Sequence, residues 1–248
     1  MARPFAQNYD VIYADKNYDN DIEVFEALAG ATPLIDKRVI EIGAGTGNHT
    51  LRLALKVGEL VSIETDADFT EILRAKLAGS AQQNIAFYDL PVENLPEMGF
   101  DAAVAFFHVV NYIGQPQLAS FLSSLAGRLK PGAYFVADLW NGAAAMIDPP
   151  REETRHKTFG GKCVTQHILP TVDAARRTVT LNYEIDIAGE GQIDKLTERI
   201  ELYLWQREEL ASALKQAGFS NVTFWDYRLF PQRARPESWR LWLCAIRV

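Results

Sequence analysis

The sequence predicts an α/β protein built around a mainly parallel sheet, and three observations support this prediction. Short apolar strand patterns alternate with helical patterns over roughly residues 19–140, and strands separated by helices form right-handed crossovers in a parallel sheet. A glycine-rich turn follows the first of these strands. No Pro-, Gly- or Ser-rich linker divides the 248 residues. We therefore expect a single domain over residues 1–248.

Each element of the parallel part follows from a local pattern. Residues 19–30 carry apolar side chains at helical spacing and end in glycine. Residues 100–107 are nearly all apolar, as in a strand buried on both faces. A helix over residues 115–129 ends at the breaker Pro131-Gly132. The five predicted strands lie near Val39, Val61, Ile85, Phe100 and Ala133, with two further helices near Thr50 and over residues 67–77.

From about residue 151 the pattern changes to consecutive strands without helices between them. Apolar and polar residues alternate over residues 178–187, which is typical of a half-buried antiparallel strand. We predict a small antiparallel β insert over residues 151–205, serving as a lid or a dimer surface. Its strands are expected at residues 162–169, 178–187 and 195–205, followed by a helix over 206–217 and a closing antiparallel hairpin of 221–229 with 239–247.

The glycine-rich turn is the most informative motif. Glu41-Ile-Gly-Ala-Gly-Thr-Gly47 links a strand to a helix start, where glycines let the backbone approach a ligand. A dinucleotide-binding turn has the spacing G-x-G-x-x-G, but here the third glycine comes one residue early and Asn48 holds the dinucleotide position. Glu64 ends the second strand about 20 residues later, where a carboxylate accepts from ribose hydroxyls. Asp66 is the second choice for that role, and a solvated strand-end charge is the alternative for Glu64.

The motif and its context resemble the class I S-adenosylmethionine (SAM)-dependent methyltransferases, whose sheet is Rossmann-like, doubly wound and seven-stranded. Glu41 to Gly47 resembles their motif I, Phe100-Asp101 their motif IV, and Leu129-Lys-Pro-Gly132 the turn before their fifth strand. The segments Tyr9-Asp-Val-Ile-Tyr13 and Phe106-Phe-His-Val-Val-Asn-Tyr112 resemble the small-molecule branch that contains the amino-sugar N-methyltransferases. The resemblance implies SAM as cofactor, S-adenosylhomocysteine as product, and no metal.

The resemblance also implies the residues that hold the cofactor. The acid-led turn suits a cationic amino-acid end and sulfonium, and the N-terminal aromatic segment would fold over them, with core packing as the alternative for its tyrosines. Asp89 stands in register with the family's adenine-flanking acid or two residues early, and a turn-initiating Asp is its other interpretation. The predicted cofactor-binding residues are Tyr9, Tyr13, Glu41, Gly43, Ala44, Gly45, Gly47, Glu64, Thr65, Asp89, Val92 and Phe106.

Methyl transfer from a sulfonium is an in-line displacement that depends mainly on alignment of the acceptor. His108 is the predicted general base, because it ends the fourth strand, where ligand crevices of parallel sheets open. A histidine merely hydrogen-bonded at a strand end is the alternative. Asn111 and Tyr112 are predicted either to orient a polar acceptor or to play a plain loop role. In the insert, Glu198 shares a face with apolar residues, so it would bind a cationic amine, pair with a neighbour of Arg199, or lie at an edge in water.

Composition limits the class of partner and the compartment. The net charge of −7 and the pI near 5.2 argue against a general nucleic-acid binder. No apolar run approaches the ~18 residues of a membrane span, and the N-terminus lacks the apolar core of a signal peptide. Cys163 and Cys244 are predicted to be buried thiols in a reducing compartment. We therefore expect a cytoplasmic protein with a small-molecule substrate, no nucleic-acid or membrane partner, and homodimerisation as an open option.

The leading functional hypothesis is SAM-dependent methylation of an N or O atom on a small polar metabolite, such as a sugar or a natural-product intermediate. Three alternatives remain open from the sequence. They are an NAD-dependent oxidoreductase, a regulatory module that binds SAM without turnover, and a methyltransferase that acts on a macromolecule such as a protein.

Overall fold

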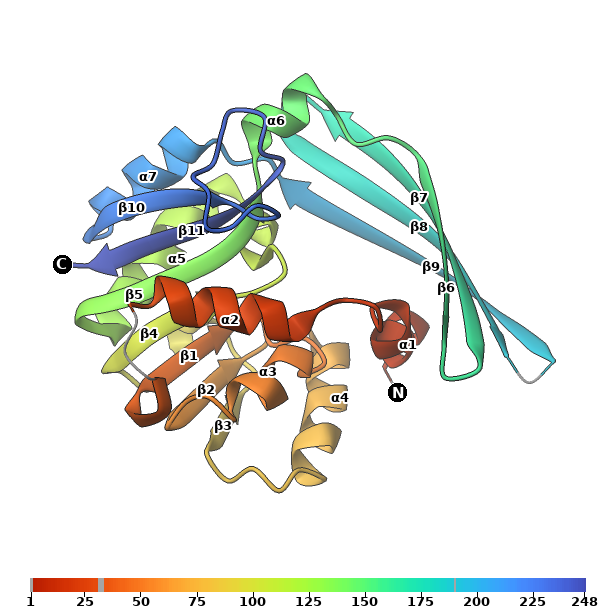
Figure 1. Cartoon of the computed structure of the whole chain (residues 1–248), viewed down its shortest axis with the longest axis horizontal. Helices are drawn as coiled ribbons and strands as arrows, with labels where there is room; N and C mark the ends of the chain where they lie inside the picture. Colours follow the sequence, from red (N-terminus) through yellow and green to blue (C-terminus); the bar gives the residue numbers. More distant parts are fainter. Residues whose placement is uncertain (1, 31–33, 190) are drawn as a thin grey trace.

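The computed structural model describes residues 2–30, 34–189 and 191–248, and it contains two sheets (Figure 1). The larger one, sheet A, has seven strands in the order β10-β11-β5-β4-β1-β2-β3. Strands β1 to β5 are parallel to one another, whereas β11 runs antiparallel to both β5 and β10. The strands are β1 Arg38–Ile42, β2 Glu59–Ile63, β3 Ile85–Tyr88, β4 Phe100–Ala105, β5 Leu129–Trp140, β10 Phe219–Asp226 and β11 Arg240–Arg247. The predicted seven-stranded, mainly parallel sheet with a C-terminal antiparallel hairpin is confirmed.

Helices pack on both faces of sheet A, and side-chain caps fix where several of them begin. Asp66 caps α4 by accepting from the N–H groups of Asp68 and Phe69. Gln206 and Glu209 form a capping box at the start of α7. The helices are α1 Pro4–Ile12, α2 Tyr18–Leu28, α3 Asn48–Leu53, α4 Ala67–Ala78, α5 Gln115–Arg128, α6 Gly142–Ile147 and α7 Arg207–Gln216, with short 3₁₀ turns η1 Leu34–Asp36, η2 Val92–Asn94 and η3 Val109–Tyr112.

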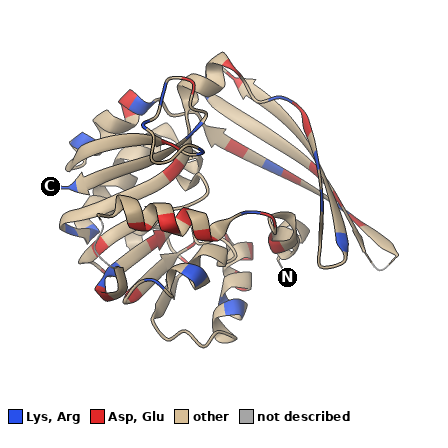
Figure 2. Ribbon diagram, viewed as in Figure 1, with Lys and Arg blue, Asp and Glu red and all other residues tan. Residues whose placement is uncertain are grey.

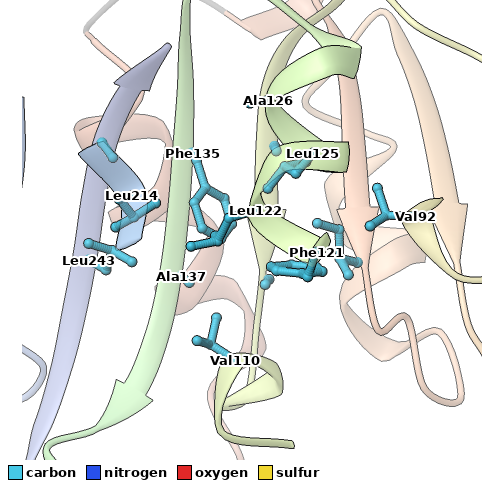
Figure 3. Close-up of a cluster of buried hydrophobic side chains, with 14 of the residues drawn as sticks. Val92, Val110, Phe121, Leu122, Leu125, Ala126, Phe135, Ala137, Leu214 and Leu243 are labelled. Atoms are coloured by element: carbon cyan, nitrogen blue, oxygen red, sulfur yellow. The ribbon is translucent and has the colours of Figure 1, made fainter. Parts of the chain in front are cut away.

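Alternate residues of β5 face two separate apolar cores. Phe135 and Ala137 belong to the core with α5 and α7, where they meet Leu122 and Leu214 (Figure 3). Val136 lies between them in sequence and packs on the opposite face with α2. Each fully buried Val, Leu or Phe side chain stabilises the fold by about 1.5–3 kcal/mol. The two cores therefore hold the central strands rigidly between helical layers, with their carboxyl ends in fixed positions.

Residues 153–203 form a second, four-stranded sheet, sheet B, in the order β6-β7-β8-β9. The strands are β6 Glu153–Phe159, β7 Lys162–Asp173, β8 Thr178–Gly189 and β9 Gln192–Tyr203. Three of them were predicted, but β6 was missed because its residues are almost all polar and exposed. One face of sheet B packs against α1, with Phe5 and Ile12 among the apolar residues of β7 and β8. Figure 1 shows sheet B extending away from sheet A, with α1 between the two.

The structure tests the predictions about the two cysteines and about membrane-spanning segments. Cys244 is buried in β11, but Cys163 is exposed near the start of β7, so the prediction of a buried thiol at that position is wrong. Cys163 alternates onto the outward face of sheet B, beside Thr158 of β6. No helix within the described ranges is both long and apolar enough to cross a membrane. Figure 2 shows Lys and Arg interspersed with Asp and Glu on the elements in view.

Candidate active site

A cavity of about 1080 Å³ lies at the carboxyl ends of β1, β2 and β4, the edge at which parallel sheets bind ligands. Gly43, Glu64 and Phe107, each just beyond the end of one of these strands, form part of its wall. The opposite walls come from α1 and from sheet B, including Tyr9 and Tyr183. The cavity is therefore enclosed by segments from the start, the middle and the last third of the chain.

The three glycines of the turn after β1 have different surroundings. Gly45 has a φ of +57°, and a Cβ added there would meet nothing within 4 Å, so this backbone directly borders the cavity. A Cβ at Gly43 would come within 2.5 Å of Val109, and one at Gly47 within 2.5 Å of Leu73. Gly43 and Gly47 are thus required for close packing of the turn, whereas Gly45 keeps the cavity wall free of a side chain.

The Glu64 carboxylate accepts hydrogen bonds from this turn and from the residues after β2 on the cavity side. Its Oε2 accepts from the Gly45 N–H at 2.7 Å, and its Oε1 accepts from the N–H groups of Thr65 and Asp66 at 2.7 and 2.9 Å. A carboxylate has roughly four acceptor sites, so capacity remains for a hydroxyl of a bound ribose. The open wall at Gly45 and the oriented Glu64 carboxylate fit a SAM-type nucleoside.

Some predicted cofactor residues lie behind the wall rather than in it. Glu41 is buried and accepts from the hydroxyls of Thr50 and Ser62 at 2.6 and 2.8 Å. Burial raises the pKa of its carboxyl group to about 7. Ala44 is also buried, and its N–H donates to the carbonyl of Ile63. Together with Gly47, these residues shape the turn without being among the described residues that line the cavity.

The remaining predicted cofactor residues are divided between cavity and surface. Val92 and Thr65 line the cavity. Asp89 instead directs its carboxylate to the surface, where it pairs with Arg74 at 2.8 Å. Its placement corresponds to the alternative interpretation, an acid in the turn after β3. Phe106 lines the cavity and stacks on His49 with ring centroids 4.4 Å apart.

The N-terminal aromatic segment covers the cavity. The rings of Tyr9 and Tyr13 lie 4.6 Å apart, and both line the cavity. Tyr9 contacts Phe69 of α4 and Tyr13 contacts Phe107, each with ring centroids 5.1 Å apart. Burial raises the pKa of both phenols well above the ordinary value, so they stay neutral. Neutral aromatic rings at this position would favour a nearby cation.

The loop after β4 brings His108 and Tyr112 into the cavity wall, with ring centroids 6.1 Å apart. Phe107 and His108 have φ values of +62° and +53°, a backbone conformation that costs about 1–3 kcal/mol for a non-glycine residue. Burial, together with the charges of Arg240 and Lys16, holds the pKa of His108 well below its ordinary value. The imidazole is therefore neutral at neutral pH, and its Nδ1 has no hydrogen-bond partner in the described part of the chain.

Asn111 has a different position from the one predicted. It is fully buried, donates from Nδ2 to the carbonyl of Tyr203 at 2.7 Å, and accepts at Oδ1 from the N–H of Trp140 at 2.9 Å. These contacts use its polar atoms to join η3 to β5 and β9. Asn111 therefore presents no group to an acceptor, and a structural role replaces the predicted orienting role.

An ion-pair cluster centred on Arg3 closes one side of the cavity. The Arg3 guanidinium contacts Asp66 and Asp68 of the α4 N-terminus at 2.8 and 2.7 Å, and Glu198 of β9 at 3.3 Å. Glu198 thus pairs with a cation, but with Arg3 and not with a neighbour of Arg199. No local sequence pattern predicts this cluster, because Arg3 lies 195 residues from Glu198.

Residues 39–132 match the family model of a methyltransferase domain. Over 75 residues the chain is 35% identical to the rRNA adenine N-6-methyltransferases of Bacillus licheniformis and Bacillus anthracis. That match covers 30% of this chain and only 26% of the length of each of these curated relatives. The family match runs from β1 into β5 and leaves sheet B outside it.

Solved structures resemble the whole chain at low sequence identity. DesVI of Streptomyces venezuelae has a TM-score of 0.82 and 16% identity, with 100% of both chains covered. CalS10 of Micromonospora echinaspora, an amino pentose methyltransferase solved with SAM bound, has a TM-score of 0.76 and 17% identity over 97% of this chain and 96% of that one. KedS8 of Streptoalloteichus sp ATCC 53650, a sugar N-methyltransferase, has a TM-score of 0.77 and 15% identity over 96% and 92%. With the family match, these structures confirm the predicted resemblance to SAM-dependent methyltransferases and the predicted fold.

Proposed function

We propose that this chain is a SAM-dependent methyltransferase and that it methylates the nitrogen of a small amine-bearing metabolite such as an amino sugar. Bound SAM supplies a methyl group carried on a positively charged sulfur. The residues of the chain must then hold the acceptor in line, exclude water and take up one proton. Tyr9 and Tyr13 exclude water from the turn at Gly45, and Tyr112 holds the acceptor beside His108.

The weak basicity of His108 is the observation that favours nitrogen over oxygen as the methylated atom. A neutral amine is already nucleophilic and needs a base only for the proton that it releases. A sugar hydroxyl needs a base strong enough to draw off its proton during attack. Because the pKa of the buried His108 lies well below its ordinary value, its imidazole is a weak base that suits the amine better than the hydroxyl.

The size and lining of the cavity support a small polar acceptor. Its volume of about 1080 Å³ has to hold both a nucleoside and the acceptor. The walls facing the acceptor carry the phenols of Tyr112 and Tyr183 and the carboxylate of Glu198, which suit hydroxyl and amino groups. The fold is shared with an amino pentose methyltransferase and a sugar N-methyltransferase, which supports the same class of acceptor.

Matched acceptor pairs test this proposal. The protein is incubated with SAM and an amino sugar, or with the same sugar carrying a hydroxyl in place of the amine, and the added methyl group is located by mass spectrometry and NMR. We expect methylation on nitrogen and none of the hydroxyl analogue. A short rRNA helix and a denatured protein mixture serve as rival acceptors. Methylation of the hydroxyl analogue alone, or of RNA or protein alone, would overturn the proposal, and SAM binding without turnover on any acceptor would indicate a regulatory module.

A further inference from the structure

A fully buried carboxylate lies behind the loop that carries His108. Asp138 follows Ala137, the last residue of β5 that pairs with β4, and it is not among the described residues lining the cavity. Its Oδ1 accepts from the backbone N–H of Phe107, and its Oδ2 accepts from Nη2 of Arg240 at 2.8 Å. One side chain thus joins the loop after β4 to β5 and β11.

The backbone that Asp138 holds is unusual. In the described ranges four non-glycine residues have positive φ, and only Phe107 and His108 are adjacent. Two successive left-handed residues without glycine persist only where neighbouring contacts hold them. A half-buried N–H at this point also needs an acceptor, and the Asp138 carboxylate provides it. The turn that aims His108 at the cavity therefore depends on this contact.

Asp138 also pairs with one of the cations that lower the pKa of the imidazole. Arg240 lines the cavity, lies over the Tyr227 ring at 3.7 Å, and has no partner for its Nε in the described structure. The groups that affect His108 are Arg240 from β11, Lys16 from the segment between α1 and α2, and the neutral Tyr112 from η3. The negative charge of Asp138 offsets one of the two cations.

We propose that Asp138 is a positioning residue for methyl transfer, which holds both the Phe107–His108 turn and the Arg240 guanidinium so that the His108 imidazole faces the acceptor. This inference rests on the proposed function, in which His108 takes up the proton of the amine. Asp138 itself touches neither ligand. It acts through the backbone of the turn and through the charge next to the ring.

Two substitutions separate these effects. Asp138→Asn keeps an oxygen for the Phe107 N–H and removes the charge, whereas Asp138→Ala removes both. We expect kcat to fall at least tenfold in Asp138→Asn and further in Asp138→Ala, with the Kd for SAM changed less than twofold. Because Arg240 is then uncompensated, the pKa of His108 falls further, and the acidic limb of kcat moves to lower pH in Asp138→Asn.

Asp101→Asn is the matched control. Asp101 also accepts from one backbone N–H, that of Arg38 at 3.0 Å, and from one cation, Lys130 at 2.8 Å, but at the opposite end of β4. We expect this control to keep the wild-type kcat and pH profile. Equal losses of kcat in Asp101→Asn and Asp138→Asn would show a general effect on the sheet and overturn the inference.

NMR gives a readout that is independent of turnover. The exchange rate of the Phe107 amide proton should rise at least tenfold in Asp138→Ala, and the His108 ring signals, among those of only four histidines, should shift in both variants. Unchanged exchange and ring signals in folded variants, or a wild-type kcat, would overturn the inference. If Asp138→Ala does not fold, the ring signals and kcat of Asp138→Asn decide. Failure of the proposed function is recognised separately, as absence of amine methylation by the wild-type protein.

Discussion

Gly45→Asp tests the cavity wall that we assign to the nucleoside. No atom lies within 4 Å of a Cβ built at Gly45, so the new side chain would project into the cavity. The Gly45 N–H donates to Glu64 Oε2 at 2.7 Å, which places the added carboxylate beside the group that would bind the ribose. A displaced ribose loses a hydrogen bond to a charged acceptor, which contributes about 1.5–3 kcal/mol. This loss corresponds to a Kd for SAM about 10- to 100-fold higher.

Isothermal titration calorimetry with SAM measures this effect, and Gly132→Asp is the matched control. Gly132 has a φ of +82° and likewise has nothing within 4 Å of an added Cβ, but it lies in β5 away from the cavity lining. Both substitutions impose the same left-handed strain, so both should lower the melting temperature, while only Gly45→Asp should weaken SAM. Wild-type SAM affinity in a folded Gly45→Asp protein, or an equal loss in the control, would refute the assigned position.

Three further predictions follow from the site. His108→Ala should lower kcat by about 10²–10⁴-fold with SAM affinity unchanged, whereas the control His156→Ala, on exposed β6, should have no effect. The acidic limb of the wild-type kcat profile should lie below pH 6.5, because burial lowers the pKa of His108. A wild-type kcat in His108→Ala would exclude His108 as the base. Arg3→Met removes three partly exposed ion pairs, which together stabilise the closed side of the cavity by about 1–2 kcal/mol. The Kd for SAM should therefore rise roughly 5- to 30-fold. A Kd unchanged at low salt would contradict a closing role for this cluster. Burial raises the pKa of Glu41 from 4.5 to about 7, so its contribution to stability is present below pH 4.5 and is lost as pH rises to 7, by about 3 kcal/mol. Urea denaturation of Glu41→Gln should lack this loss. A free energy of unfolding that changes with pH in the same way in the two proteins would contradict this prediction.

The sheet was predictable because its strands obey simple periodic rules. Strands β1 to β5 are short apolar runs between helical patterns, and the alternation along β8 shows which side is buried. Strand β6 was missed, since its residues are nearly all polar and exposed. It is recognisable as a strand only through its pairing with β7.

The kind of site can be predicted from the sequence, but the roles of its individual residues cannot. The spacing of the glycines predicts a nucleoside-binding turn, yet it treats all three glycines alike, and only packing separates Gly45 from Gly43 and Gly47. The sequence leaves both an acceptor-orienting role and a plain loop role open for Asn111, because its partners, Trp140 and Tyr203, lie 29 and 92 residues away. Such contacts depend on tertiary structure and leave no local pattern.

A crystal structure with S-adenosylhomocysteine tests the central assignment most directly. We predict that the nucleoside lies against Gly45, that a ribose hydroxyl donates to Glu64, and that its sulfur faces the side of the cavity walled by His108 and Tyr112. A nucleoside found elsewhere on the molecule, or a cavity left empty at saturating concentration, would contradict the account.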